Sequence, residues 1–172
     1  MALPKDYSGL GCSLSRSLEV LGERWTLLII RDAFHGVRRF SDFAQHLSMS
    51  RAVLSDRLAG LVEHGVLVKK PAGGYAEYEL TAKGKELWPV VLGLTHWGDK
   101  HYASGGAPEV FEHTEDDGRL DGVGVCESCG HQVDAEEVRA TPRRIDFRSN
   151  SENAISKALT RRHRLLQPLK NG

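Results

Sequence analysis

Two cysteines in the segment VCESCGH are separated by two residues and followed by a glycine, the spacing of one half of a zinc knuckle. A tetrahedral zinc site needs two more ligands, and the candidates are His113, upstream of Cys126, and His131, just after Cys129. The upstream segment FEHTEDDG contains a histidine but no cysteine, so we expect a degenerate zinc-ribbon-like site with metal ligands His113, Cys126 and Cys129. The acidic run EHTEDDGRLD lacks the ligand spacing of a calcium loop, which favours a solvated turn.

The third cysteine, Cys12, precedes a helix that we expect from Ser13, as its cap, to Leu21. The positive end of a helix dipole favours the reactive thiolate, so Cys12 is a candidate redox-sensing residue. The alternative is a small side chain packed at a subunit contact. An odd number of cysteines does not suggest a secreted module held by disulfides.

The composition is that of a soluble globular protein, with 40% hydrophobic and 27% charged residues in 172. The first residues contain no apolar core segment, which argues against a signal peptide. The longest apolar run, WTLLII, is far shorter than the ~20 residues that cross a bilayer. We therefore expect a cytoplasmic protein with no membrane partner.

A formal net charge of zero conceals strong segregation of charge along the chain. Residues 31–70 carry seven basic and four acidic side chains, residues 109–137 ten acidic and one basic, and residues 138–172 nine basic and two acidic. The basic terminal region could touch DNA or RNA, or it could fold onto the acidic segment. Local patches rather than the overall charge therefore determine whether a polyanion can bind.

The basic segment 31–70 contains two short helix patterns followed by two strand patterns. Ser41 is expected to cap a helix through Leu47, Ser48 and Ser50 to form a turn, and a second helix to run from Arg51 to His64 before Gly65. The runs VLVKK and YAEYEL, joined by PAGG, are typical of a β-hairpin. This order is that of a winged helix-turn-helix, whose second helix enters the DNA major groove.

Small or polar side chains on the outer half of that second helix permit close approach to a groove, and the surrounding cations suit phosphates. Arg57 has an alternative interpretation as a structural ion-pair partner, and the two lysines as solvated residues of an edge strand. The candidate DNA-contacting residues are Arg38, Arg39, Ser41, Ser50, Arg51, Ala52, Ser55, Asp56, Arg57, Lys69 and Lys70.

The flanking segments predict the rest of the architecture. A helix from Arg24 to Phe34 is apolar nearly all round, which places it in the core. Thr81 begins a helix of about twenty residues, kinked at Pro89, whose apolar side chains exceed what one core contact requires. We predict a first domain over residues 1–103, a linker at 104–108, and an appendage over 109–172 that comprises a ribbon-like part, 109–142, and a basic tail, 143–172.

Several spaced motifs between Cys12 and Gly98 resemble the HxlR-type branch of winged-helix bacterial regulators. They are the cysteine before the first helix, GERWTLLIIRD, G-x-RRF, VLSDRL, EYELT-x-x-G and the final WG. The resemblance implies a transcription factor that binds operator DNA as a homodimer through the first helix and the long helix after the hairpin. Some members of this family sense oxidants or electrophiles through a cysteine matching Cys12. The hairpin of this chain is shorter than the usual one and lacks its later proline.

The sequence thus predicts a mainly α fold with a small β-hairpin wing (α+β), extended by a β-rich, ribbon-like C-terminal appendage. We find no nucleophile elbow, phosphate loop or His-x-x-x-His pair, so we do not expect an enzyme. The expected function is sequence-specific transcriptional regulation, as repressor or activator, with a small-molecule or electrophile effector. The alternatives are a winged-helix module for protein contacts without specific DNA binding, and a zinc- or thiol-dependent activity in the tail.

Overall fold

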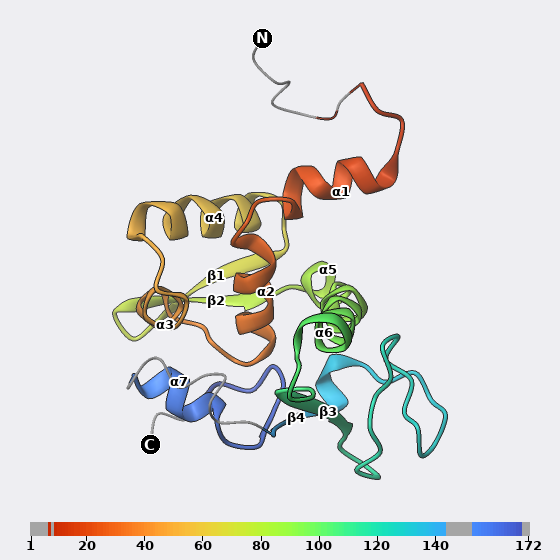
Figure 1. Ribbon diagram of the computed structural model, residues 1–172. Coiled ribbons are helices and arrows are strands. Elements are labelled where there is room, and N and C mark those ends of the chain that lie inside the picture. Colours follow the sequence, from red (N-terminus) through yellow and green to blue (C-terminus); the bar gives the residue numbers. More distant parts are fainter. Residues whose placement is uncertain (1–6, 8, 144–152, 170–172) are drawn as a thin grey trace.

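The computed structural model describes residues 7, 9–143 and 153–169, and within them helices and two small sheets share one core (Figure 1). The helices are α1 (Ser13–Leu21), α2 (Thr26–Phe34), α3 (Phe40–Leu47), α4 (Arg51–Glu63), α5 (Ala82–Lys85), α6 (Trp88–Tyr102), the 3-10 helix η1 (Ala135–Glu137) and α7 (Ala154–Leu159). The strands are β1 (Leu67–Ala72), β2 (Tyr75–Leu80), β3 (Glu109–His113), β4 (Val138–Pro142) and β5 (His163–Arg164). The α+β winged-helix prediction is confirmed.

Two predicted helix caps were wrong. Helix α3 begins at Phe40, and Ser41 lies inside it with its hydroxyl donating to Asp42. The chain before α3 pairs with strand β2, because the Tyr78 N–H donates to Arg38 at 2.8 Å and Arg39 bridges Glu77. This pairing holds Arg39 extended and makes it the N-cap. Helix α1 likewise has Cys12, not Ser13, at its N-cap.

Helix α4, the second helix of the predicted pair, begins and ends where its flanking serine and glycine predict. The Val53 N–H donates to the hydroxyl of Ser50, which satisfies one free backbone donor of the first turn of α4. The helix ends next to Gly65, whose φ of +69° costs least in a residue without a Cβ. Ser48, at φ +50°, makes the turn from α3 into α4.

The hairpin is an antiparallel pair, with Leu67 opposite Leu80 and Ala72 opposite Tyr75. Gly73 and Gly74, both at positive φ, form the two-residue turn that matches the twist of the strands. The turn is therefore shorter than the predicted PAGG connection, because Pro71 lies in β1 opposite Ala76.

The predicted kink at Pro89 was also wrong. The chain forms two helices, α5 and α6, and the proline stands in the first turn of α6. A proline there lacks only a backbone N–H that has no partner within the helix, and its fixed φ suits helix initiation. The hydroxyl of Thr81 accepts from the Gly84 N–H and caps α5, so a helix does start at Thr81, although it is α5 and not one helix of about twenty residues.

One continuous core joins the first hundred residues to the later ones. Ile29, Ile30 and Phe34 of α2 are completely buried, and the ring of Trp88 lies 5.4 Å from that of Phe34 and 5.1 Å from that of Phe111 in β3. Strands β3, β4 and β5 form an antiparallel sheet in that order. The division of the chain at residues 104–108 stays a prediction.

The described part of the basic tail folds onto the rest of the molecule. Its spacing of apolar residues corresponds to helix α7, which packs against α3. Arg162 pairs with Glu112 at 2.8 Å and with Asp117 at 3.0 Å, so this part of the tail forms ion pairs with two side chains of the acidic segment. Within the described residues, no helix is long and apolar enough to span a membrane.

Candidate nucleic-acid interface

Helix α4 has one face in the core and one in solvent. Leu54, Leu58 and Leu61 are at most 1% exposed and attach the helix to the domain. The opposite side of its N-terminal half is exposed and small or polar, consisting of Ser50, Arg51, Ala52, Ser55 and Asp56. A helix fixed on one side and free of bulky groups on the other can approach the floor of a major groove.

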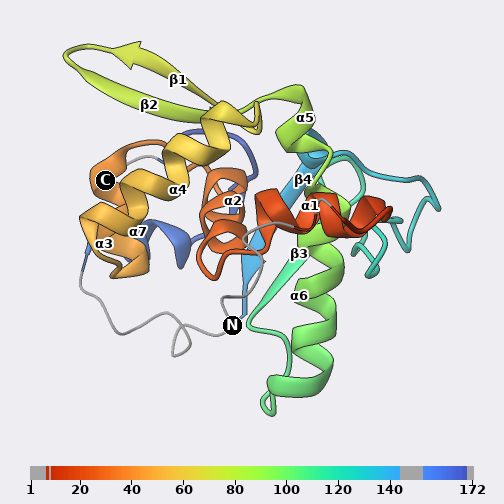
Figure 2. The ribbon, with the colours of Figure 1, turned by 90° about the horizontal axis from the view of Figure 1, so that it is seen from above.

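The hairpin projects beyond the helices as a wing (Figure 2). Lys69, Lys70, Pro71 and the tip from Gly73 to Tyr75 are exposed. The wing is tied to the start of α3 by Arg39, whose guanidinium lies 4.0 Å from the centroid of the Tyr75 ring and donates to the Tyr75 hydroxyl. This contact fixes the position of the wing relative to α3 and α4, the two helices of the recognition pair.

Three of the predicted DNA-contacting cations form close ion pairs with carboxylates, at 2.8 Å or less. Arg38 and Lys70 both reach Glu79, at 2.8 and 2.6 Å. The hydrogen bond from Lys70, together with the charge of Arg38, lowers the pKa of Glu79 despite its partial burial. Arg57 pairs with Glu23, 34 residues away, at 2.8 Å. These pairs hold the framework and reduce the charge available to a phosphate.

The remaining cations contact aromatic rings. The Arg51 guanidinium lies 4.9 Å from the ring centroid of Phe40, and the Lys69 ammonium lies 5.9 Å from that of Tyr78. No carboxylate of the described residues comes within 4 Å of either cation, whereas Arg39 has Glu77 at 3.9 Å. Ring contacts orient a cation without neutralising it, so Arg51 and Lys69 are the strongest candidates for binding DNA, followed by Arg39, whose pair with Glu77 is long.

A second kind of surface lies on α1 and α6. Helix α1 stands off the body in Figure 1, with Ser15 as its only buried residue. Leu14 and Leu18 of α1 are exposed, as are Leu94 and Trp97 of α6, at 51% and 54%. Exposed apolar side chains on two helices are typical of a surface that a partner covers. The thiol of Cys12 is exposed at the start of α1.

A cavity of about 630 Å³ lies between α2, α6 and the C-terminal region. Its wall includes apolar side chains and the buried carboxylate of Asp32, which accepts from Arg31 at 2.6 Å and from the imidazole of His46 at 2.6 Å. Asp99 also lines it, and burial raises the pKa of Asp99 above its ordinary value. The volume is suited to a small organic ligand.

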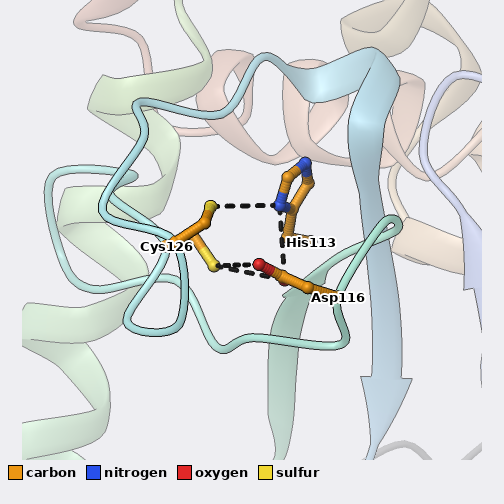
Figure 3. Close-up of side chains that lie close together, drawn as sticks. His113, Asp116 and Cys126 are labelled. Carbon is orange, nitrogen blue, oxygen red and sulfur yellow. Dashed lines mark hydrogen bonds and ion pairs between the residues drawn. The ribbon is translucent and has the colours of Figure 1, made fainter.

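The three predicted metal ligands lie together, and a fourth side chain joins them. Donor atoms of His113, Cys126, Cys129 and Asp116 all lie within 4.8 Å of one another (Figure 3). His131, the other candidate, is exposed and outside this cluster. Sequence reasoning missed Asp116 because it interpreted the acidic run as a solvated turn. The available signal was that Asp116 follows His113 by three residues in a segment already suspected of binding metal.

The exposed small-residue face of α4, the helix before it and the wing after it define the class of winged helix-turn-helix proteins. The chain belongs to the HxlR-like helix-turn-helix family, whose family model matches residues 20–105, half of the chain. It is a helix-turn-helix transcriptional regulator and not an enzyme.

Similar proteins extend the match beyond the winged helix. The HTH-type transcriptional regulator Rv3095 of Mycobacterium tuberculosis is 38% identical over 136 residues, covering 77% of this chain and 86% of its own. YdeP of Bacillus subtilis, also an HTH-type regulator, is 30% identical over 103 residues, with 56% and 80% covered. The crystal structure of PA1607, classed as a transcription factor, superposes with a TM-score of 0.60 at 36% identity, covering 74% of this chain and 92% of that one. The match to Rv3095 covers more residues than the first 108 of this chain contain, so it includes part of the appendage.

Proposed function

We propose that this protein is a cytoplasmic regulator that binds operator DNA as a homodimer, with α4 in the major groove and the wing on the adjacent backbone. The observation that carries the proposal is the exposed N-terminal half of α4, small except for Arg51, whose guanidinium rests on Phe40 without a carboxylate partner among the described residues. The small residues allow the helix to enter a groove, and Arg51 is the one long cation that this face then brings to the bases.

The apolar surface of α1 and α6 supports a second copy of this chain as the partner. Leu14, Leu18, Leu94 and Trp97 would otherwise remain in water. Two copies related by a two-fold axis place two α4 helices on one side of DNA, which fits a pseudo-palindrome with half-sites about one helical turn apart. The subunit contact is therefore part of the recognition mechanism.

Two features support an effector. The exposed thiol of Cys12 lies at the start of α1, where oxidation or alkylation would alter a helix of the proposed subunit contact. The cavity beside Asp32 could take a small ligand against α2 and α6. Either event would act on DNA binding through the spacing of the two α4 helices.

The test is DNA binding measured across a salt series. Duplexes tiled over the region upstream of the gene for this protein are the probes, with a scrambled duplex of equal length as reference. We expect Arg51→Ala to lower affinity for the bound duplex by ~1–3 kcal/mol and, if Arg51 reads a base, to relax preference at one position per half-site. Arg39→Ala should weaken binding to both duplexes and reduce the salt slope by about one.

Arg57→Ala is the matched control, since it removes an arginine of the same helix that Glu23 already neutralises. It should change affinity less than Arg51→Ala does. An unchanged affinity in Arg51→Ala, or no preference for any tiled duplex over the scrambled one, would contradict the proposal. The latter result would favour a module for protein contacts.

The subunit contact is tested by light scattering at micromolar concentration. The wild type should have the mass of a dimer, and Trp97→Asp, which puts a charge in the α6 surface, should shift it to the monomer. Lys100→Asp changes an exposed residue of the same helix and is the control. A monomeric wild type would remove the homodimer from the proposal.

A further inference from the structure

The cluster in Figure 3 is assembled from three separate pieces of chain. His113 is the last residue of β3, Asp116 lies in the turn that follows, and Cys126 and Cys129 belong to a tight loop that precedes η1. His113 and Cys126 are buried, whereas Asp116 and Cys129 are exposed. A metal ion could therefore enter from solvent and complete its coordination inside.

Four distances between the donor atoms are close to those of a tetrahedral zinc site. With Zn–S, Zn–N and Zn–O bonds of about 2.3, 2.0 and 2.1 Å, a tetrahedron separates sulfur from nitrogen by about 3.5 Å, nitrogen from oxygen by about 3.4 Å, and sulfur from oxygen by about 3.6 Å. Cys129 Sγ lies 3.6 Å from His113 Nδ1, which is 3.3 Å from Asp116 Oδ1. Cys126 Sγ lies 3.3 and 3.5 Å from the two Asp116 oxygens.

The loop around the two cysteines is built closely around their sulfur atoms. The Gly130 N–H donates to the Cys126 carbonyl at 2.8 Å, and Gly130 has a φ of +73°. The backbone N–H of His131 donates to the Cys129 sulfur. Gly118 lies so near the Cys126 sulfur that a Cβ there would collide with it.

The carboxylate of Asp116 is also oriented by its surroundings. The Gly118 N–H donates to Asp116 Oδ1 at 2.9 Å and holds the carboxylate toward the cluster. The second ring nitrogen of His113, Nε2, lies 4.0 Å from Glu115, which is too long for a hydrogen bond. Glu115 therefore adds negative charge near the cluster without forming a bond to the imidazole.

We propose that His113, Asp116, Cys126 and Cys129 bind one zinc ion, which fastens the loop between β3 and η1. Two thiolates and an imidazole select zinc over magnesium or calcium, which take oxygen ligands. Four protein ligands leave no position open for a substrate, so the ion is structural. The site goes beyond the DNA-binding function and does not depend on it.

The loop that zinc would fasten lies against α6. Within it, Gly124 approaches Leu92 and Gly122 approaches His96 of that helix, and the side chain of Leu120 is buried. The described loop forms no extended strand between β3 and η1. Isolated bridges and turn hydrogen bonds hold it, such as those from the Cys126 N–H to the His131 carbonyl and from the Val133 N–H to the Gly124 carbonyl, each 2.9 Å long. A bound metal ion would add a cross-link between the end of β3 and the cysteine loop.

The experiment uses the full chain without an affinity tag that binds metal. Elemental analysis after loading with one equivalent of zinc and desalting should give about one zinc per chain. Cobalt(II) titrated into the metal-free protein should give the intense visible bands of a tetrahedral site and a thiolate-to-cobalt absorption. Cys129→Ser, at an exposed position, should remove the thiolate band or halve it, and Asp116→Asn should weaken zinc binding about 10–100-fold.

Cys12→Ser is the matched control and should retain the wild-type zinc content and spectrum. Well under one zinc per chain in the wild type, together with an absent cobalt spectrum, would overturn the proposal. A disulfide between Cys126 and Cys129 that zinc cannot displace would also overturn the proposal. It would be detected as a loss of two free thiols in freshly isolated, metal-free protein. The wild-type zinc content and cobalt spectrum decide whether the proposal holds, so a variant that fails to fold does not affect the conclusion.

Discussion

Replacement of Asp32 tests how the recognition pair is held on the core. Asp32 is completely buried on α2, and its carboxylate accepts from Arg31 on one oxygen and from His46, in the last turn of α3, on the other. The bond to His46 is a direct side-chain link between the central helix and the first helix of the recognition pair. Asp32→Asn keeps the shape and one acceptor, whereas Asp32→Ala removes both bonds.

The expected loss in the free energy of unfolding depends on how exposed the partners of Asp32 are. Removing one member of a buried pair costs ~3–5 kcal/mol when the other charge stays buried. The Arg31 side chain is 35% exposed and regains water, so we discount this to about 2–3 kcal/mol for Asp32→Ala. Asp32→Asn should cost about 1–2 kcal/mol, because its amide oxygen still accepts from Arg31.

The assay is urea unfolding at a fixed protein concentration, since a dimer is stabilised by mass action. Glu23→Gln is the control, because that carboxylate is 59% exposed and its pair with Arg57 should be worth at most ~1 kcal/mol. A thermal scan should show a fall of about 4–12 °C for Asp32→Ala. If Asp32→Ala cost no more than Glu23→Gln, the link between α2 and α3 would carry no net stability.

The same replacement has a pH signature. Burial by itself raises the pKa of Asp32, but the charge of Arg31 and the bond with His46 outweigh it and hold the pKa below its ordinary value of 3.8. The stability that the carboxylate contributes is therefore complete above pH 3.8 and is lost as the pH falls through the lower folded-state pKa. The difference in the free energy of unfolding between the wild type and Asp32→Asn should shrink in that acidic range and stay constant between pH 5 and about 6.

Two further predictions concern other parts of the chain. Diamide should weaken DNA binding by the wild type and leave Cys12→Ser unaffected, whereas equal responses of the two proteins would assign Cys12 a packing role. Gly36→Ala should lower the free energy of unfolding by at least ~1 kcal/mol, because Gly36 has a φ of +88° and a Cβ there would collide with the Gln167 carbonyl. Gly60→Ala, in an open position of α4, should instead be neutral or stabilising, and a similar loss in both variants would refute this account of Gly36.

The elements that local chemistry determines were predictable from the sequence. Ser50 and Gly65 delimit α4 because a cap and a left-handed glycine act on their immediate neighbours. Gly73 and Gly74 set the hairpin turn for the same reason. The start of α3 was misplaced because a contact with β2, nearly forty residues later, holds Arg39 extended.

The charges and the metal ligands depended on the tertiary structure. The sequence left open whether Arg57 is a structural ion-pair partner, and only the fold brings Glu23 to it. The fold also brings Glu79 to Arg38 and Lys70, a pairing that the sequence does not indicate. The two cysteines predicted a metal site, and Asp116 joins the proposed ligands because the turn after β3 and the cysteine loop lie close together. The sequence by itself thus determined the order of elements, the recognition helix and the family, since these rest on interactions between near neighbours in the chain. The tertiary structure decided which cations stay free for DNA and which side chains gather at the proposed metal site, because both depend on distances between residues that are far apart in the chain.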